Sequence, residues 1–245
     1  MNLDTLPNTD TAKGLQKNNG DKNALRKPRI PLENTKNGLR DNHMARRVIL
    51  TVSLWFAVVL YLSLIGFYHE TIGQPPVNII ISLIIPISLF ALFYGTSQNF
   101  KAFVLNLDAS LVVGFHALRT VGFSFLVLAN IGSLPWFFAL PAGLGDIAVA
   151  LSAPVMSYSL WKNSAFITSH RFYIWNMFGL VDFIIALSSG ALSTVLGISV
   201  VGAPMTYMSV LPLVMIPVFA VPLFTITHII MLIKIKNAQE SMMIA

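Results

Sequence analysis

The chain has 245 residues and a formal net charge of +6, with 55% hydrophobic residues, 11% charged residues and no cysteine. Because a soluble domain carries about 25% charged residues, this chain has too few to cover a soluble fold of its size. The composition therefore predicts an integral membrane protein. The absence of cysteine excludes disulfides, iron–sulfur clusters, thiolate zinc sites and a cysteine nucleophile.

Residues 1–45 differ in composition from the rest of the chain. They are rich in Asn, Lys and Arg, and they show no apolar periodicity. Such a segment buries too little apolar area to offset the entropy of ordering its backbone, so we predict a disordered basic tail. We expect this tail to be a solvated cytoplasmic arm, with contact to anionic lipid headgroups as an alternative.

Residues 46–245 are predicted to form an all-α transmembrane domain, a six-helix bundle. A spanning helix needs roughly 20 mainly apolar residues. Six runs meet this requirement, near 47–68, 77–94, 108–130, 142–161, 171–190 and 207–234. The sixth run contains Pro212, Pro217 and Pro222. Because each proline frees a backbone carbonyl, we expect this helix to be kinked.

The basic residues predict the orientation of these helices. Lys and Arg fall beside alternate ends of the runs, and the connections 69–76, 131–141 and 191–206 contain none. The positive-inside rule then places both termini in the cytoplasm. All sixteen Lys and Arg residues fit this topology except Arg119. The Asn- and Ile-rich composition, with no eukaryotic targeting signal, favours the inner membrane of a bacterium.

Two charged residues lie near the middle of predicted spans. Arg119 is in the third run and Asp182 is in the fifth, at similar depths. Placing an arginine at the bilayer centre costs about 3 kcal/mol on insertion scales, so a partner is needed. A carboxylate matches the fork of the guanidinium group. We therefore predict an Arg119–Asp182 ion pair between neighbouring helices.

Other polar residues extend this candidate site. Asp146 is in the fourth run, within a stretch rich in Gly, Ala and Ser that is typical of close helix packing, and it is expected to reach Arg119. One guanidinium with two carboxylates carries net negative charge, which attracts a cation or keeps one carboxyl protonated. His116 shares a face with Arg119, and Asn176 lies on the inner side of Asp182.

The polar residues concentrate on the last four spans, which predicts a functional four-helix core with two peripheral helices. Structural pairing of the charges is the alternative to a ligand or ion site. For His116 the alternative to a role in the site is a hydrogen bond between helices. For His228 the alternative to such a role is a position near the lipid headgroups. The chain has no phosphate-binding or dinucleotide-binding loop and no protease or hydrolase motif, so a catalytic enzyme is not favoured.

Two motifs carry a resemblance. The first is Pro-Ala-Gly-Leu-Gly-Asp at 141–146, and the second is Trp-Asn-Met-Phe-Gly-Leu-Val-Asp at 175–182. With the prolines of the sixth run, they resemble a group of small uncharacterised bacterial multi-pass inner-membrane proteins. The resemblance covers roughly residues 110–235 and implies no activity.

Three functions compete at this point. The first is a small secondary transporter whose Arg119, Asp146 and Asp182 bind an ion or small polar solute, with carboxylate protonation as the coupling step. The second is a structural or accessory membrane subunit. The third is a haem-binding or quinone-linked redox protein with His116 and His228 as axial ligands. The expected partners are the lipid bilayer and a small polar solute or proton, with no cofactor and no nucleic acid.

Overall fold

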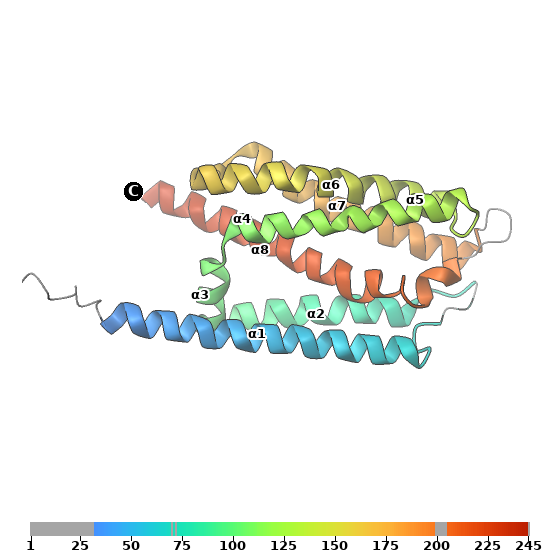
Figure 1. Cartoon of the computed structure of the whole chain (residues 1–245), viewed down its shortest axis with the longest axis horizontal. Coiled ribbons are helices and arrows are strands. Elements are labelled where there is room, and N and C mark those ends of the chain that lie inside the picture. Colours follow the sequence, from blue (N-terminus) through green and yellow to red (C-terminus); the bar gives the residue numbers. More distant parts are fainter. Residues whose placement is uncertain (1–31, 70, 72, 199–204, 245) are drawn as a thin grey trace, which may run out of the picture. The chain divides into compact units, whose positions relative to one another are not determined.

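The computed structural model describes the backbone of residues 32–69, 71, 73–198 and 205–244. Within these residues every regular element is a helix (Figure 1). The chain divides into residues 1–40 and a compact unit of residues 41–245, which is described below. Residues 1–31 of the predicted tail lie outside the described residues. The first helix begins at Leu32, within the rest of that tail, and the disorder of residues 1–45 stays a prediction.

The helices follow one another with short connections. In chain order they are α1 (Leu32–Leu64), α2 (Val77–Thr96), α3 (Gln98–Asn106), α4 (Ala109–Gly114), η1 (Phe115–Gly122), α5 (Phe123–Asn130), α6 (Trp136–Lys162), η2 (Ser164–Thr168), α7 (His170–Leu196), η3 (Met205–Ser209), η4 (Ile216–Ala220) and α8 (Val221–Ile244).

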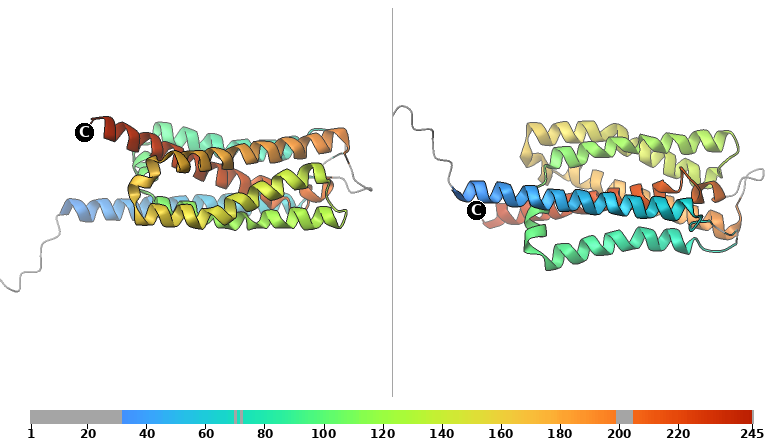
Figure 2. Two further views of the ribbon diagram at one scale, coloured as in Figure 1. Left: turned by 90° about the horizontal axis from the view of Figure 1, so that it is seen from above. Right: turned by 60° about the horizontal axis from the view of Figure 1, so that its bottom comes forward.

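Six helical stretches in the described residues are long and apolar enough to cross a membrane, as the hydropathy pattern predicted. They are His43–Leu64, Val77–Thr96, Ala109–Asn130, Trp136–Lys162, His170–Leu196 and Ile216–Met243. Consecutive spans run in opposite directions in the bundle (Figures 1 and 2). The chain is therefore a multi-pass membrane protein. We call the two ends of the bundle the His170 end and the Leu196 end, after the first and last residues of α7.

The third span is not a uniform α-helix. It consists of α4, the 3₁₀ helix η1 and α5 in direct succession. Asp108 caps its beginning, since its carboxylate accepts a 3.1 Å hydrogen bond from the Leu111 amide. A 3₁₀ stretch of eight residues inside a span is unusual, because runs longer than three or four residues are uncommon, and such stretches often mark functional positions.

The sixth span differs from its predicted position. It begins at Ile216 and ends at Met243, whereas the sequence predicted residues 207–234. Pro212 lies in a turn before the span, Pro217 in the π-helical segment η4, and Pro222 in the first turn of α8. Pro212 therefore lies before the span, and Pro217 and Pro222 lie in its N-terminal part, where α8 continues directly from the π-helical segment. The kink expected from these prolines stays a prediction.

The fourth span also begins earlier than predicted. The 27-residue α6 starts at Trp136, with Pro135 at its N-cap, so Pro141 lies inside the helix, just before the predicted start of the span at residue 142. The five apolar residues before Pro141 continue the helix in the N-terminal direction. As a result Asp146 lies further from the beginning of the span than it does in the predicted run 142–161.

The last four spans form the core of the bundle. In an apolar stretch of 18 residues within each span, buried residues make up 28% to 44% for these four spans, but only 6% for the first span and 11% for the second. The prediction of two peripheral helices is therefore confirmed. The short helix α3, which the sequence did not predict, connects α2 to the core. Lys234 of α8 holds the C-terminal end of α3 in place by donating hydrogen bonds to the carbonyls of Leu105 and Leu107.

Candidate functional site

The site is built around Arg119, whose side chain is only 1% exposed. Arg119 belongs to the 3₁₀ helix η1, in which residues three apart lie directly above one another. The buried residues of η1 are His116, Arg119 and Gly122, which follow this spacing. The 3₁₀ geometry therefore aligns a histidine, an arginine and a glycine along one line that faces the bundle interior.

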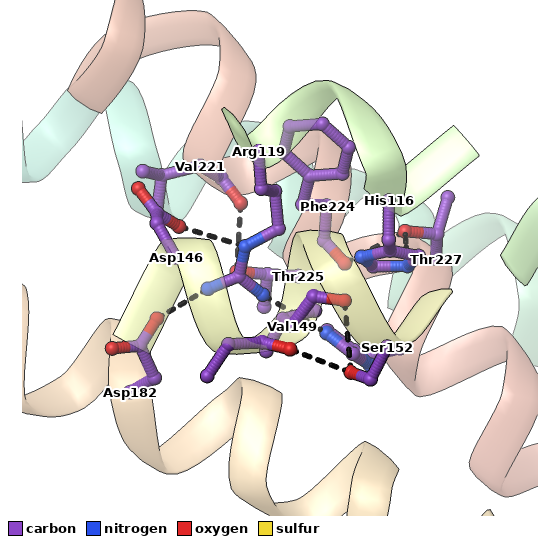
Figure 3. Close-up of polar contacts among 12 residues, drawn as sticks. His116, Arg119, Asp146, Val149, Ser152, Asp182, Val221, Phe224, Thr225 and Thr227 are labelled. Carbon is purple, nitrogen blue, oxygen red and sulfur yellow. Dashed lines mark hydrogen bonds and ion pairs between the residues drawn. The ribbon is translucent and has the colours of Figure 1, made fainter. Parts of the chain in front are cut away.

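Two carboxylates bind the guanidinium group from neighbouring helices (Figure 3). Arg119 Nε donates to Asp146 Oδ1 of α6 at 2.7 Å. Arg119 Nη2 forms an ion pair with Asp182 Oδ2 of α7. Both pairings confirm predictions made from the sequence, including the one that required the third and fifth spans to be neighbours.

The third nitrogen of the guanidinium group contacts His228 of α8. Arg119 Nη1 is 3.3 Å from His228 Nε2. An arginine can only donate, so Nε2 accepts with its lone pair and the ring proton must be on Nδ1. His228 Nδ1 then donates to the side-chain carbonyl of Asn176 at 3.1 Å, and the amide nitrogen of Asn176 donates to the Phe172 carbonyl at 2.9 Å. The hydrogen bonds are mutually consistent: Arg119 links η1 to His228 of α8, and His228 links α8 directly to Asn176 of α7.

An aromatic ring completes the surroundings of Arg119. The guanidinium carbon lies 3.9 Å from the centroid of the Phe183 ring. Phe183 comes directly after Asp182 on α7, so one turn of that helix supplies both the counter-charge and the ring. Cation–π contact is stronger in a desolvated position than at an exposed surface. Four helical elements therefore meet at one buried cation.

Three glycines make space for the polar residues of this site. A Cβ atom placed on any of them would overlap a site side chain from a neighbouring helix. The pairs are Gly122 with Asp146, Gly145 with Asp182, and Gly179 with His228. None of these glycines was predicted from the sequence as part of the site. The available signal was that Gly145 and Gly179 lie within the two motifs that contain the aspartates, and that Gly122 lies three residues after Arg119.

His116 lies beside this network without contacting the carboxylates. Its Nε2 is 3.0 Å from the hydroxyl of Thr227, and that hydroxyl donates to the Phe224 carbonyl at 2.7 Å. His116 therefore forms a hydrogen bond between η1 and α8, which confirms the alternative prediction for this residue. Its Nδ1 is buried and has no hydrogen-bond partner among the residues that the structure describes. The ring packs edge-on against Trp175, with centroids 5.4 Å apart.

His116 and His228 do not fit the haem alternative. Their ring centroids are 4.1 Å apart. Two axial ligands need more separation than this, because each metal–imidazole bond alone is about 2 Å long and starts at the edge of the ring. In addition, the Nε2 atom of His228 already accepts from Arg119. His228 is also fully buried beside the midspan cluster, and the predicted position near the headgroups was wrong because the sixth span begins later than expected.

The charges of this cluster do not balance within the protein. Arg119 supplies one positive charge, and Asp146 and Asp182 supply two negative charges when both are ionised. The side chains of these aspartates are 11% and 5% exposed, so little water screens the excess charge. A buried cluster with one excess negative charge has a physical reason to take up a proton or another cation.

Comparison with known proteins identifies one family. A family model described as a domain of unknown function, DUF8737, matches residues 75–235. The matched region contains all the polar residues of the Arg119 cluster and both sequence motifs. Searches of curated proteins and of solved structures found no significant match.

Proposed function

This chain belongs to the DUF8737 family, and we propose that it is a small proton-coupled secondary transporter for an ion or a small polar solute. The observation that carries the proposal is the buried Arg119 with two carboxylates in the middle of the four-helix core. Ionisable residues inside membrane spans are costly and commonly mark ion or substrate pathways.

In the proposed mechanism the carboxylates of Asp146 and Asp182 share one proton, which neutralises the cluster. Release of that proton leaves one excess negative charge, and binding of a cation or a protonated solute group restores neutrality. His228 holds the third nitrogen of Arg119 during this exchange, and Asn176 orients the His228 ring by accepting from its Nδ1. The 3₁₀ segment η1 and the π-helical η4 both lie within membrane spans, and their non-standard backbone supplies the deformability for alternating access.

We further propose the orientation with both termini in the cytoplasm of a bacterium, in the inner membrane. Its support is the distribution of Lys and Arg, which are missing from the connections at the Leu196 end. In this orientation the Leu196 end faces outward.

A structural role is the second candidate, and one observation favours it. All three nitrogens of Arg119 have partners inside the protein, so the network is complete without a ligand. In this alternative the charges hold four helices in register and nothing binds to them.

Uptake by proteoliposomes separates the two candidates. The assay imposes a pH gradient and offers a panel of radiolabelled amino acids, sugars and organic acids one at a time. We expect the wild type to accumulate a member of the panel, and Asp146→Asn and Asp182→Asn to abolish its uptake while remaining in the membrane. The double variant Arg119→Asp with Asp182→Arg is expected to be inserted but inactive. Normal uptake by both Asn variants, or no accumulation by the wild type, contradicts the proposal, and normal uptake by the double variant supports the structural role.

A further inference from the structure

A groove between α7 and α8 lies at the His170 end of the bundle. The two helices pack against each other, and the space between them at this end is a cavity of about 590 Å³. Binding sites for small molecules have volumes of about 300–1,000 Å³, so the groove is large enough to hold a ligand. None of the residues in the Arg119 cluster lines it. The groove is therefore a separate candidate site.

The lining of this groove changes from polar to apolar along its depth. Its outer end is formed by His170 of α7 with Lys236 and Gln239 of α8, and its inner end by Met177 of α7 and Leu232 of α8. On each helix the two ends are seven residues apart, a rise of about 10 Å. The headgroup region of a bilayer is only about 5–8 Å deep on each side, so the inner end lies among the acyl chains. This gradient matches a lipid molecule.

The outer end of the groove carries a positive charge. The side chain of Lys236 is 77% exposed, and no acidic residue is among the described residues that line the groove. Glu240 is 3.9 Å from Lys236, but an exposed pair of this kind is weak and leaves the ammonium group able to bind another anion. His170, Tyr173 and Gln239 add N–H and O–H donors. A phosphate group matches this combination of a cation and neutral donors.

We infer that this groove binds one anionic phospholipid, with its phosphate beside Lys236 and His170 and one acyl chain against Met177 and Leu232. Basic pockets between membrane helices on the cytoplasmic side are typical binding sites for phospholipid headgroups. The proposed orientation places the groove in the cytoplasmic leaflet, whose surface is negatively charged. A lipid that binds only the folded bundle also stabilises it, and α7 and α8 are the helices that carry Asp182 and His228.

Native mass spectrometry of the delipidated protein in detergent tests this inference. The protein is titrated with phosphatidylglycerol and, separately, with phosphatidylcholine of the same acyl chains, so that the two ligands differ in headgroup charge. We expect one phosphatidylglycerol molecule to bind about fivefold more tightly, the factor that one lysine near an anionic lipid contributes. Inorganic phosphate at the same concentration is expected to leave the lipid bound, because it makes no contact with the apolar end of the groove.

Four variants locate the binding to the groove. Lys236→Gln is expected to remove the preference for phosphatidylglycerol, and the matched control Lys162→Gln, an exposed lysine at the same end but outside the groove, is expected to keep it. Met177→Trp fills the inner end and is expected to weaken the binding of both lipids. Phe178→Trp, at the exposed neighbouring position, is expected to bind like the wild type.

Three results overturn the inference. They are equal affinity of the wild type for the two lipids, displacement of phosphatidylglycerol by inorganic phosphate, and an equal effect of Lys236→Gln and Lys162→Gln. Both lysines are exposed, so their replacement leaves the folded bundle intact. Because lipid binding is measured without transport, this inference and the proposed function fail separately.

Discussion

Arg119→Ala is expected to lower the free energy of unfolding by about 3–5 kcal/mol, because removing one partner of a buried ion pair leaves the other charge uncompensated. Here two carboxylates, Asp146 and Asp182, lose the cation with which both are paired, and the Phe183 ring loses its contact as well. The change in stability is measured by SDS-induced unfolding of the detergent-solubilised protein, followed by tryptophan fluorescence.

The matched control for this variant is Arg171→Ala. Arg171 is exposed at the beginning of α7, where its replacement is expected to change stability by no more than about 0.5 kcal/mol. Adding Asp146→Asn and Asp182→Asn to the Arg119→Ala background is expected to recover part of the loss, since the carboxylates are then neutral. An Arg119→Ala protein as stable as Arg171→Ala contradicts the buried network.

Gly145→Ala is expected to have the second-largest effect, although it adds only one methyl group. The new Cβ overlaps the carboxyl group of Asp182, which must then move away from Arg119. Overpacking of a buried position costs about 1–3 kcal/mol, and loss of the ion-pair geometry adds to this. The same unfolding measurement detects the change, with the abundance of folded protein in membranes as a second readout.

Gly95→Ala is the control for the added methyl group. Nothing lies within 4 Å of a Cβ atom at Gly95, which is near the end of α2. Because alanine favours a helix over glycine, this variant is expected to be as stable as the wild type or slightly more stable. Shortening the clashing side chain, in Gly145→Ala with Asp182→Ala, is expected to cost less than the sum of the single changes. Additive costs contradict a direct contact between these two positions.

The number of spans and the central ion pairs were predictable from the sequence for physical reasons. The cost of an unpaired arginine in lipid is large, so Arg119 requires partners, and the sequence offered Asp182 at a similar depth and Asp146 in the next run, within reach of the arginine side chain. Apolar runs of spanning length are equally distinctive. Both signals depend on composition and depth alone, and they need no knowledge of the backbone.

The rest of the site depends on backbone detail that hydropathy does not encode. The contact between His228 and Arg119 was missed because the prolines placed the start of the sixth span too early, which put His228 at the wrong depth. The 3₁₀ helix that aligns His116 with Arg119 has no distinctive residue pattern. The glycines that accommodate Asp146, Asp182 and His228 act between helices, so their role appears only once the packing is known.

The central claim is that the Arg119 cluster binds a proton-coupled solute, and native mass spectrometry of the gently solubilised protein tests it most directly. Wild type is compared with Arg119→Ala and with Asp182→Asn, whose side chain is nearly the same size as the original. The claim predicts a copurifying non-lipid mass in the wild type that is lost in both variants. If only lipid is bound by the wild type, and the variants differ from it in stability alone, the cluster is structural and the claim is contradicted.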